Sequence, residues 1–226
     1  MAVEEVGLWK FADCPNFAYD HADWNIYGCM NVDRLHQLLK GSFKDHTWEW
    51  IVGFLKDICG QEKGLDLIDE WFSIIPHFSD IRQFGDKLTH MKQWTGAEYK
   101  DMVKVSFPVC AFLLKGHPDH FKFIKSVTHL ILIASYHSHT ETTLKYLQNA
   151  VSAISTNIHL FLPYHKSHSM SKIPRIHSLL RYIECSREMG FADNSGPAVS
   201  EATHTNLIKD GDQFSYKVDY IPQMLR

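Results

Sequence analysis

The sequence predicts a mainly α-helical protein. Over several long segments, apolar residues recur three and four positions apart, which is the spacing of one buried helix face. The chain has 226 residues, enough for a large hydrophobic core, and its 45% hydrophobic and 22% charged residues are typical of a globular protein. We found neither an internal repeat nor a low-complexity tract.

Residues 1–32 are predicted to be rich in loops. Through Asp33 the chain carries six acidic side chains against the single base Lys10, and its aromatic residues follow no helical period. A short strand is expected near residues 24–27.

A helix is predicted from Arg34 onward, with Asp33 as its N-cap, because a carboxylate there can accept from the free amides of the first turn. Gly41 is expected to mark a kink. The residues that follow the helical period are Leu35, Leu38, Leu39, Ser42, Phe43, His46 and Trp50.

Further helices are predicted for residues 61–75, which Pro76 ends, and for residues 97–115 around Pro108, with an irregular stretch at 77–96 between them. Residues 121–136 are nearly all apolar and therefore buried. Their β-branched content leaves helix and strand open, although the length favours a helix.

Residues 141–162 give the clearest helical signal. Ser138 and Glu141 have the spacing of a capping box at its start. Its coiled-coil-like seam consists of Leu144, Leu147, Val151, Ile154, Ile158 and Phe161.

The last part of the chain is predicted to contain a helix over residues 175–188, a turn-rich break at 190–197 and a short helix at 200–210. One face of the helix at 175–188 is expected to carry Ile176, Leu179, Leu180 and Ile183.

Composition excludes several classes of protein. A formal net charge of −3 argues against a surface that is basic all round. Five cysteines without a CxxC pair argue against a disulfide scaffold, and no apolar run approaches the ~20 residues that cross a bilayer. We therefore expect a soluble intracellular protein that makes no contact with membranes.

Fifteen histidines are unusual and raise the question of metal binding. The candidate spacings are His117 with His120, His137 with His139, and His165 with His168. None has the spacing of a closed four-ligand zinc site, so we interpret these histidines as surface or interface residues. A histidine-rich metal-binding helical protein is the less favoured hypothesis.

Two short segments each place a carboxylate and a histidine three residues apart, Asp33 with His36 and Glu201 with His204. Residues at i and i+3 share a helix face, so each pair presents an oxygen ligand beside an imidazole. Carboxylates from separate parts of the chain are what a two-Mg²⁺ phosphoryl-transfer site needs. The alternative is structural: Asp33 is an N-cap, and Glu201 is a first-turn acid that complements the helix dipole.

Four ordered blocks resemble the Plavaka-type transposases of fungal DNA transposons, which are related to the CACTA and Kyakuja-Dileera-Zisupton groups. The first block is residues 32–46, which read VDRLHQLLKGSFKDH, and the second is residues 92–96 with Glu98, Lys100 and Met102. The third is residues 174–179 with Tyr182, Glu184, Ser186 and Arg187. The fourth contains Asp193, Asn194, Glu201, His204, Lys209 and Asp210.

This resemblance implies a fragment of a DDE-type DNA strand-cleavage and transfer domain. The transposase-like region would span residues 33–210, with a helical, bundle-like insertion at about 47–172 and a partial RNase H-like remnant at its two ends. Residues 211–226 would form a C-terminal tail. Asp33 and Glu201 match the second and third acidic residues, which would bind Mg²⁺ or Mn²⁺. His36, His177 and His204 match histidines that would support them.

The family's first catalytic Asp lies upstream of the first block, on a strand that we do not find here. We therefore expect the chain to be catalytically inactive alone. The resemblance further implies that the protein acts in the nucleus and that its partner is double-stranded DNA at transposon ends. A second copy of the chain is a further candidate partner.

Residues 159–187 carry five basic side chains against Glu184, which predicts contact with DNA phosphates. These residues are Lys166, Lys172, Arg175, Arg181 and Arg187, called the basic stripe below. The alternative is an exposed helix face that covers acidic neighbours. The second hypothesis for the whole chain is a non-catalytic remnant, a helical module that binds only DNA or protein.

Overall fold

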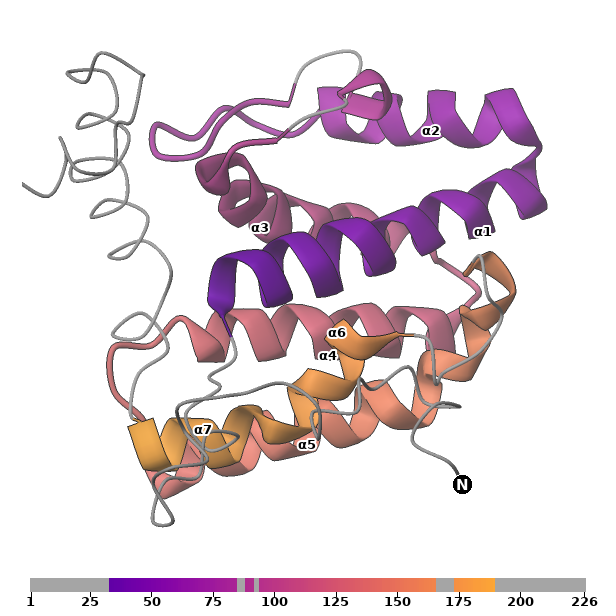
Figure 1. The fold of residues 1–226 in the computed structure, drawn as a ribbon. Coiled ribbons are helices and arrows are strands. Elements are labelled where there is room, and N and C mark those ends of the chain that lie inside the picture. The colour runs from indigo at the N-terminus through magenta and orange to yellow at the C-terminus, as the bar shows by residue number, and fades with distance from the viewer. Residues whose placement is uncertain (1–32, 85–87, 92–93, 166–172, 190–226) are drawn as a thin grey trace, which may run out of the picture.

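The computed structural model describes residues 33–84, 88–91, 94–165 and 173–189, and every regular element in them is a helix (Figure 1). The predicted mainly helical fold is confirmed. The strand expected at 24–27, the RNase H-like remnant at the two ends and the helix expected at 200–210 lie outside these ranges. The α-helices are α1 (Glu49–Cys59), α2 (Gln61–Ser73), α3 (Gly96–Leu113), α4 (Pro118–Ala134), α5 (Glu141–Asn157), α6 (Pro174–His177) and α7 (Tyr182–Met189).

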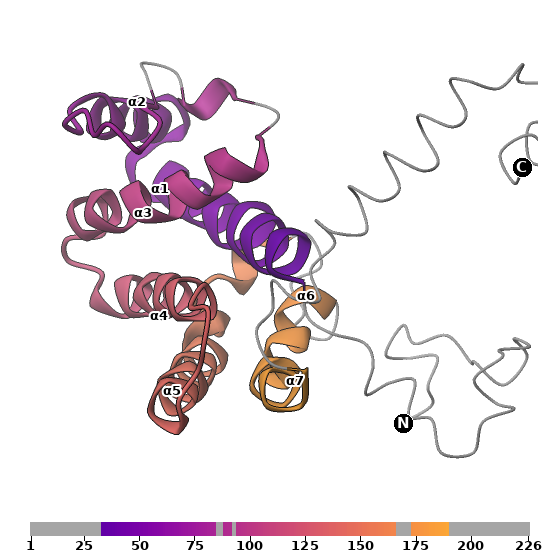
Figure 2. The same ribbon diagram turned by 90° about the vertical axis from the view of Figure 1, so that its left-hand side faces the viewer.

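The helices are stacked in the order α2, then α1 with α3, then α4, then α5 with α7 (Figures 1 and 2). A π-helix, η4 (Arg34–Trp48), precedes α1 and continues into it. Short 3₁₀ turns complete the described part: η5 (Leu88–His90), η6 (Ile158–Leu160), η7 (Leu162–Tyr164) and η9 (Ser178–Arg181).

The predicted helix at Arg34 is present but is wound more widely than an α-helix. Ser42 Oγ donates to the carbonyl of Gln37 and Thr47 Oγ1 to that of Ser42, each over 2.8 Å. Serine and threonine in an α-helix bond three or four residues back, whereas these bond five back, as the i→i+5 pattern of a π-helix requires. The helix runs through Gly41, where an added Cβ would overlap the side chain of Arg175.

Helices α1 and α2 form a hairpin around Gly60, whose φ of 93° suits glycine. Helix α2 ends at Ser73, shortly before Pro76, and α3 runs through Pro108, so the helices predicted for 61–75 and 97–115 are both confirmed. The described residues between them are irregular apart from η5.

The second resemblance block builds the start of α3. The amide of Glu98 donates to Thr95 Oγ1 (3.3 Å), and the carboxylate of Glu98 accepts from the amide of Thr95, which completes a capping box. Glu98 is buried and pairs with Arg82. Helix capping and packing therefore explain Thr95 and Glu98 of this block.

Helix α4 settles the ambiguity at 121–136 in favour of a helix. Helix α5 packs along it, but the capping prediction was wrong. Thr140 and Thr143 form the capping box, because Thr140 is the extended residue directly before the first turn. Glu141 instead binds Arg187 (2.7 Å). Of the predicted seam, Ile158 and Phe161 lie beyond the end of α5 and are nevertheless buried.

Residues 174–189 are not one helix, which corrects the prediction for 175–188. The turn η9 separates α6 from α7 and changes the period from 3.6 to about 3.0 residues per turn. Leu180, expected inside, is therefore 59% exposed, whereas Tyr182 is buried.

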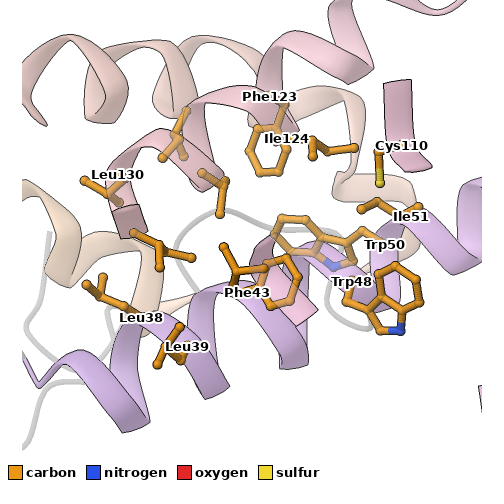
Figure 3. Close-up of a cluster of buried hydrophobic side chains, with 14 of the residues drawn as sticks. Leu38, Leu39, Phe43, Trp48, Trp50, Ile51, Cys110, Phe123, Ile124 and Leu130 are labelled. Atoms are coloured by element: carbon orange, nitrogen blue, oxygen red, sulfur yellow. The ribbon is translucent and has the colours of Figure 1, made fainter. Parts of the chain in front are cut away.

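The core lies where η4 and α1 meet α4. Figure 3 shows Leu38, Phe43 and Trp50 pointing toward Phe123 and Leu130, and all five are at most 1% exposed. These side chains belong to one continuous cluster that also reaches α2, α3 and α5. No helix in the described ranges is long and apolar enough to cross a membrane.

Candidate functional site

Asp33 stands at the start of η4 and is the N-cap that the sequence predicts. Its Oδ1 accepts from the amide of Leu35 (3.0 Å), and its Oδ2 accepts from the amide of His36. The ring of His36 returns toward the same carboxylate, with Nδ1 2.8 Å from Oδ2. Because a carboxylate only accepts, Nδ1 carries the proton of this bond. The predicted Asp33–His36 pair is therefore formed.

The carboxylate of Asp33 retains room for one more ligand. An ionised carboxylate offers about four lone-pair positions, and the three N–H donors leave one free on Oδ1. The side chain is 18% exposed, so solvent reaches it. A hard cation that prefers oxygen could bind Oδ1 from one side without displacing the cap.

The other residues of the predicted metal site lie partly or wholly outside the description. Glu201 and His204 fall in 190–226, so their distance from Asp33 stays a prediction. His177 closes α6 in the backbone, and its side chain is not described. The described residues contain no group of three or more His, Cys, Asp or Glu side chains that could hold a metal ion.

Two arginines of the basic stripe are joined to acidic residues. Arg175 pairs with Asp45 of η4, and its side chain lies over Gly41. Arg187 pairs with Glu141 of α5 over 2.7 Å, and this hydrogen bond and charge raise the pKa of the Arg187 guanidinium. Arg181 lies in η9, whereas Lys166 and Lys172 are outside the described ranges. Acidic neighbours are thus present at two stripe positions, as the alternative interpretation expects.

Several histidines pack among aromatic rings. The ring of His120 stacks on Phe54 with centroids 4.2 Å apart, and His117 meets the edge of the same ring at 4.9 Å. Burial, followed by the charge of His117, lowers the pKa of His120. This pair therefore behaves as the interface histidines that we predicted.

A second histidine cluster was not predicted. His46 of η4 stacks on Trp50, with ring centroids 5.3 Å apart, and lies 5.5 Å from the ring of His165. Burial, together with the charges of His165 and Arg175, lowers the pKa of His46 to about 4, although Asp45 opposes this. Only the burial of His46 in the helical stripe was visible in the sequence, because His165 and Arg175 come from distant segments.

Residues 2–51 match the protein family described as Plavaka transposase. The match includes Asp33, His36 and the wide helix η4 as far as its junction with α1. No curated protein and no solved structure matches the chain. The family match therefore supports a transposase-derived protein of Plavaka type.

Proposed function

We propose that this protein is a piece of a DDE-type DNA strand-cleavage and transfer domain that acts on double-stranded DNA in the nucleus. The observation that carries the proposal is the match of residues 2–51 to Plavaka transposases, together with the position of Asp33 inside it. In this proposal Asp33 and Glu201 are acidic metal ligands. His36 orients Asp33 through its bond to Oδ2, and His177 and His204 support the same site.

The donor chemistry of Asp33 fits Mg²⁺ or Mn²⁺. Its free Oδ1 position is a hard oxygen, and the cap amides and His36 hold the carboxylate in one orientation. Divalent ions at such a site stabilise the attacking and leaving oxygens of a phosphoryl transfer. With two acidic ligands, we expect weak metal binding and no strand cleavage by the chain alone.

Metal binding is tested by thermal unfolding of the full chain with and without 10 mM MgCl₂ or MnCl₂. If the Kd is on the order of 1 mM, binding raises the free energy of unfolding by about 1.4 kcal/mol. Asp33→Asn is the decisive variant, because asparagine caps a helix as well as aspartate but lacks the charge. We expect Asp33→Asn and Glu201→Gln to fold normally and to lose most of the metal response. An undiminished response in both variants, or no response in the wild type, would refute the metal site.

DNA contact through the basic stripe is tested separately. Arg175 and Arg187 also form ion pairs within the protein, so the informative variant replaces Lys166 and Lys172 by alanine. Each lost phosphate contact should reduce the slope of log affinity against log salt concentration by about 0.9. Exposed Lys63→Ala on α2 is the control. DNA binding that is unchanged by the double substitution would remove the stripe from the proposal.

The second candidate is a non-catalytic remnant that binds only DNA or protein. The three N–H donors on the Asp33 carboxylate favour it, because helix capping alone explains why an acid stands there. Stripe-dependent DNA binding without any metal response would select this candidate.

A further inference from the structure

Helix α2 forms the end layer of the helix stack, and large apolar side chains are exposed along its border with α3 (Figure 2). The ring of Trp71, in the last turn of α2, stacks on Phe112 of α3, with centroids 4.8 Å apart and planes at 13°. Phe112 is nevertheless 58% exposed, so Trp71 covers only part of it. Ile74, the C-cap of α2, lies three residues after Trp71 on the same side of the helix and is 61% exposed.

The exposed apolar surface continues past the end of α2. Phe78 is 51% exposed and lines a small hollow together with Ile75 and with Val105 of α3. Exposed apolar side chains that gather in this way mark interaction sites on soluble proteins. The apolar patch, as we call it below, consists of Trp71, Ile74, Phe78 and Phe112.

The exposed face of α2 beside the patch is acidic. Glu62, Asp66 and Glu70 follow one another at intervals of four residues and are all exposed, so they form one row along the helix, called the acidic row below. Lys63 is the single base of α2. The ion pairs found in the described part of the chain include no carboxylate of this row. Like charges at i and i+4 repel each other, and cations laid along the row would relieve this repulsion.

The charges around the patch restrict what can cover it. On the α3 side Lys104 is paired with Asp101 (3.2 Å), and Lys115 stands beyond the end of the helix, so negative charge prevails along α2. Carboxylates repel the phosphates of nucleic acids and of anionic membranes. A second copy that docked through the same patch would bring two acidic rows together. A basic segment of another protein meets neither obstacle.

We propose that the apolar patch and the acidic row are the docking site of a partner protein, which presents a segment with apolar residues next to lysines or arginines. The apolar side chains of this segment pack on Ile74, Phe78 and the exposed part of Phe112, and its basic side chains lie over the acidic row. Buried aromatic anchors carry much of the binding energy of an interface, whereas charge pairs at its rim favour the correct partner. The basic stripe and the proposed metal site contribute no residue here, so this surface stands apart from the function proposed above.

The test measures the binding of a fluorescently labelled peptide to the full chain by anisotropy. The peptide joins a leucine-rich half to a lysine-rich half, in either order, and the same peptide with glutamate in place of lysine is its control. We expect the lysine peptide to bind, with an affinity that falls as the KCl concentration rises. Ile74→Ser should weaken this binding about tenfold and Glu70→Lys about fivefold. Both residues are exposed, so both variants should fold.

Matched substitutions elsewhere on the surface control for the change of residue type. Leu180 of η9 is 59% exposed and Glu188 is an exposed acid of α7, so Leu180→Ser and Glu188→Lys should leave the affinity unchanged. Sedimentation of the chain alone tests the competing occupant: a dimer that Ile74→Ser dissociates would assign the patch to a second copy and overturn the proposal. It is also overturned when the lysine peptide does not bind, when the glutamate peptide binds equally well, or when the variants and their controls bind alike.

Discussion

Protonation of His46 should make the fold sensitive to acid. Its ring stacks on Trp50 of the core, and burial, followed by the charges of His165 and Arg175, lowers its pKa from 6.5 to about 4. In the unfolded chain the same ring has its ordinary pKa. Between these two values the unfolded state binds the proton and the folded state does not. The free energy of unfolding must therefore fall as the pH drops from 6.5 toward 4.

The size of this effect follows from the two pKa values. Full protonation would remove about 3.4 kcal/mol, and by pH 5 about 2 kcal/mol of this would be lost. The ring of His46 is partly exposed, so solvent screening reduces these figures, and we expect a loss of about 1 kcal/mol between pH 7.5 and pH 5. His120 and His139 also have lowered pKa values from burial and add to the loss with the same sign.

Urea unfolding of the wild type and of His46→Phe at pH 7.5, 6 and 5 measures the contribution of this one ring. Phenylalanine keeps a ring against Trp50 but cannot bind a proton. We expect the variant to lose about 1 kcal/mol less than the wild type over this range. Exposed His129→Gln controls for the removal of a histidine. The reasoning is wrong if His46→Phe and the wild type show the same dependence on pH.

Three further substitutions test the packing by urea unfolding at pH 7.5. Gly41→Ala should cost about 1–3 kcal/mol, because its Cβ would overlap Arg175; an unchanged midpoint would contradict this contact. Thr128→Val should stabilise the fold by about 1 kcal/mol, since the buried Thr128 hydroxyl has no hydrogen-bond partner in the described structure, and a loss of stability would reveal one. Glu98→Ala should cost about 2 kcal/mol by removing the return bond of the α3 capping box and the partner of Arg82, unlike exposed Glu62→Ala.

Local patterns accounted for most of the helices. Apolar residues at helical spacing located η4 with α1, α2, α3 and α5, and the Asp33 cap was visible because its partners lie two and three residues away. The same short range explains the errors. Ser138 and Glu141 had the spacing of a capping box, but only the backbone conformation at Thr140 decides which residue caps α5.

In the candidate site, too, contacts within one helix could be predicted and contacts between distant segments could not. The bond between Asp33 and His36 spans three residues of one helix and could be predicted from spacing. The pairs of Arg175 with Asp45 and of Arg187 with Glu141 join residues 130 and 46 positions apart, so no local spacing could have predicted them.

The sequence by itself determined where most of the helices lie and which face of most of them is apolar, because both depend on neighbours within a turn or two. The tertiary structure alone decided the break of the segment at 175–188, the environment that lowers the pKa of His46, and the pairing of Arg175 with Asp45. These features depend on which helices pack together, and no spacing within a single segment encodes that choice.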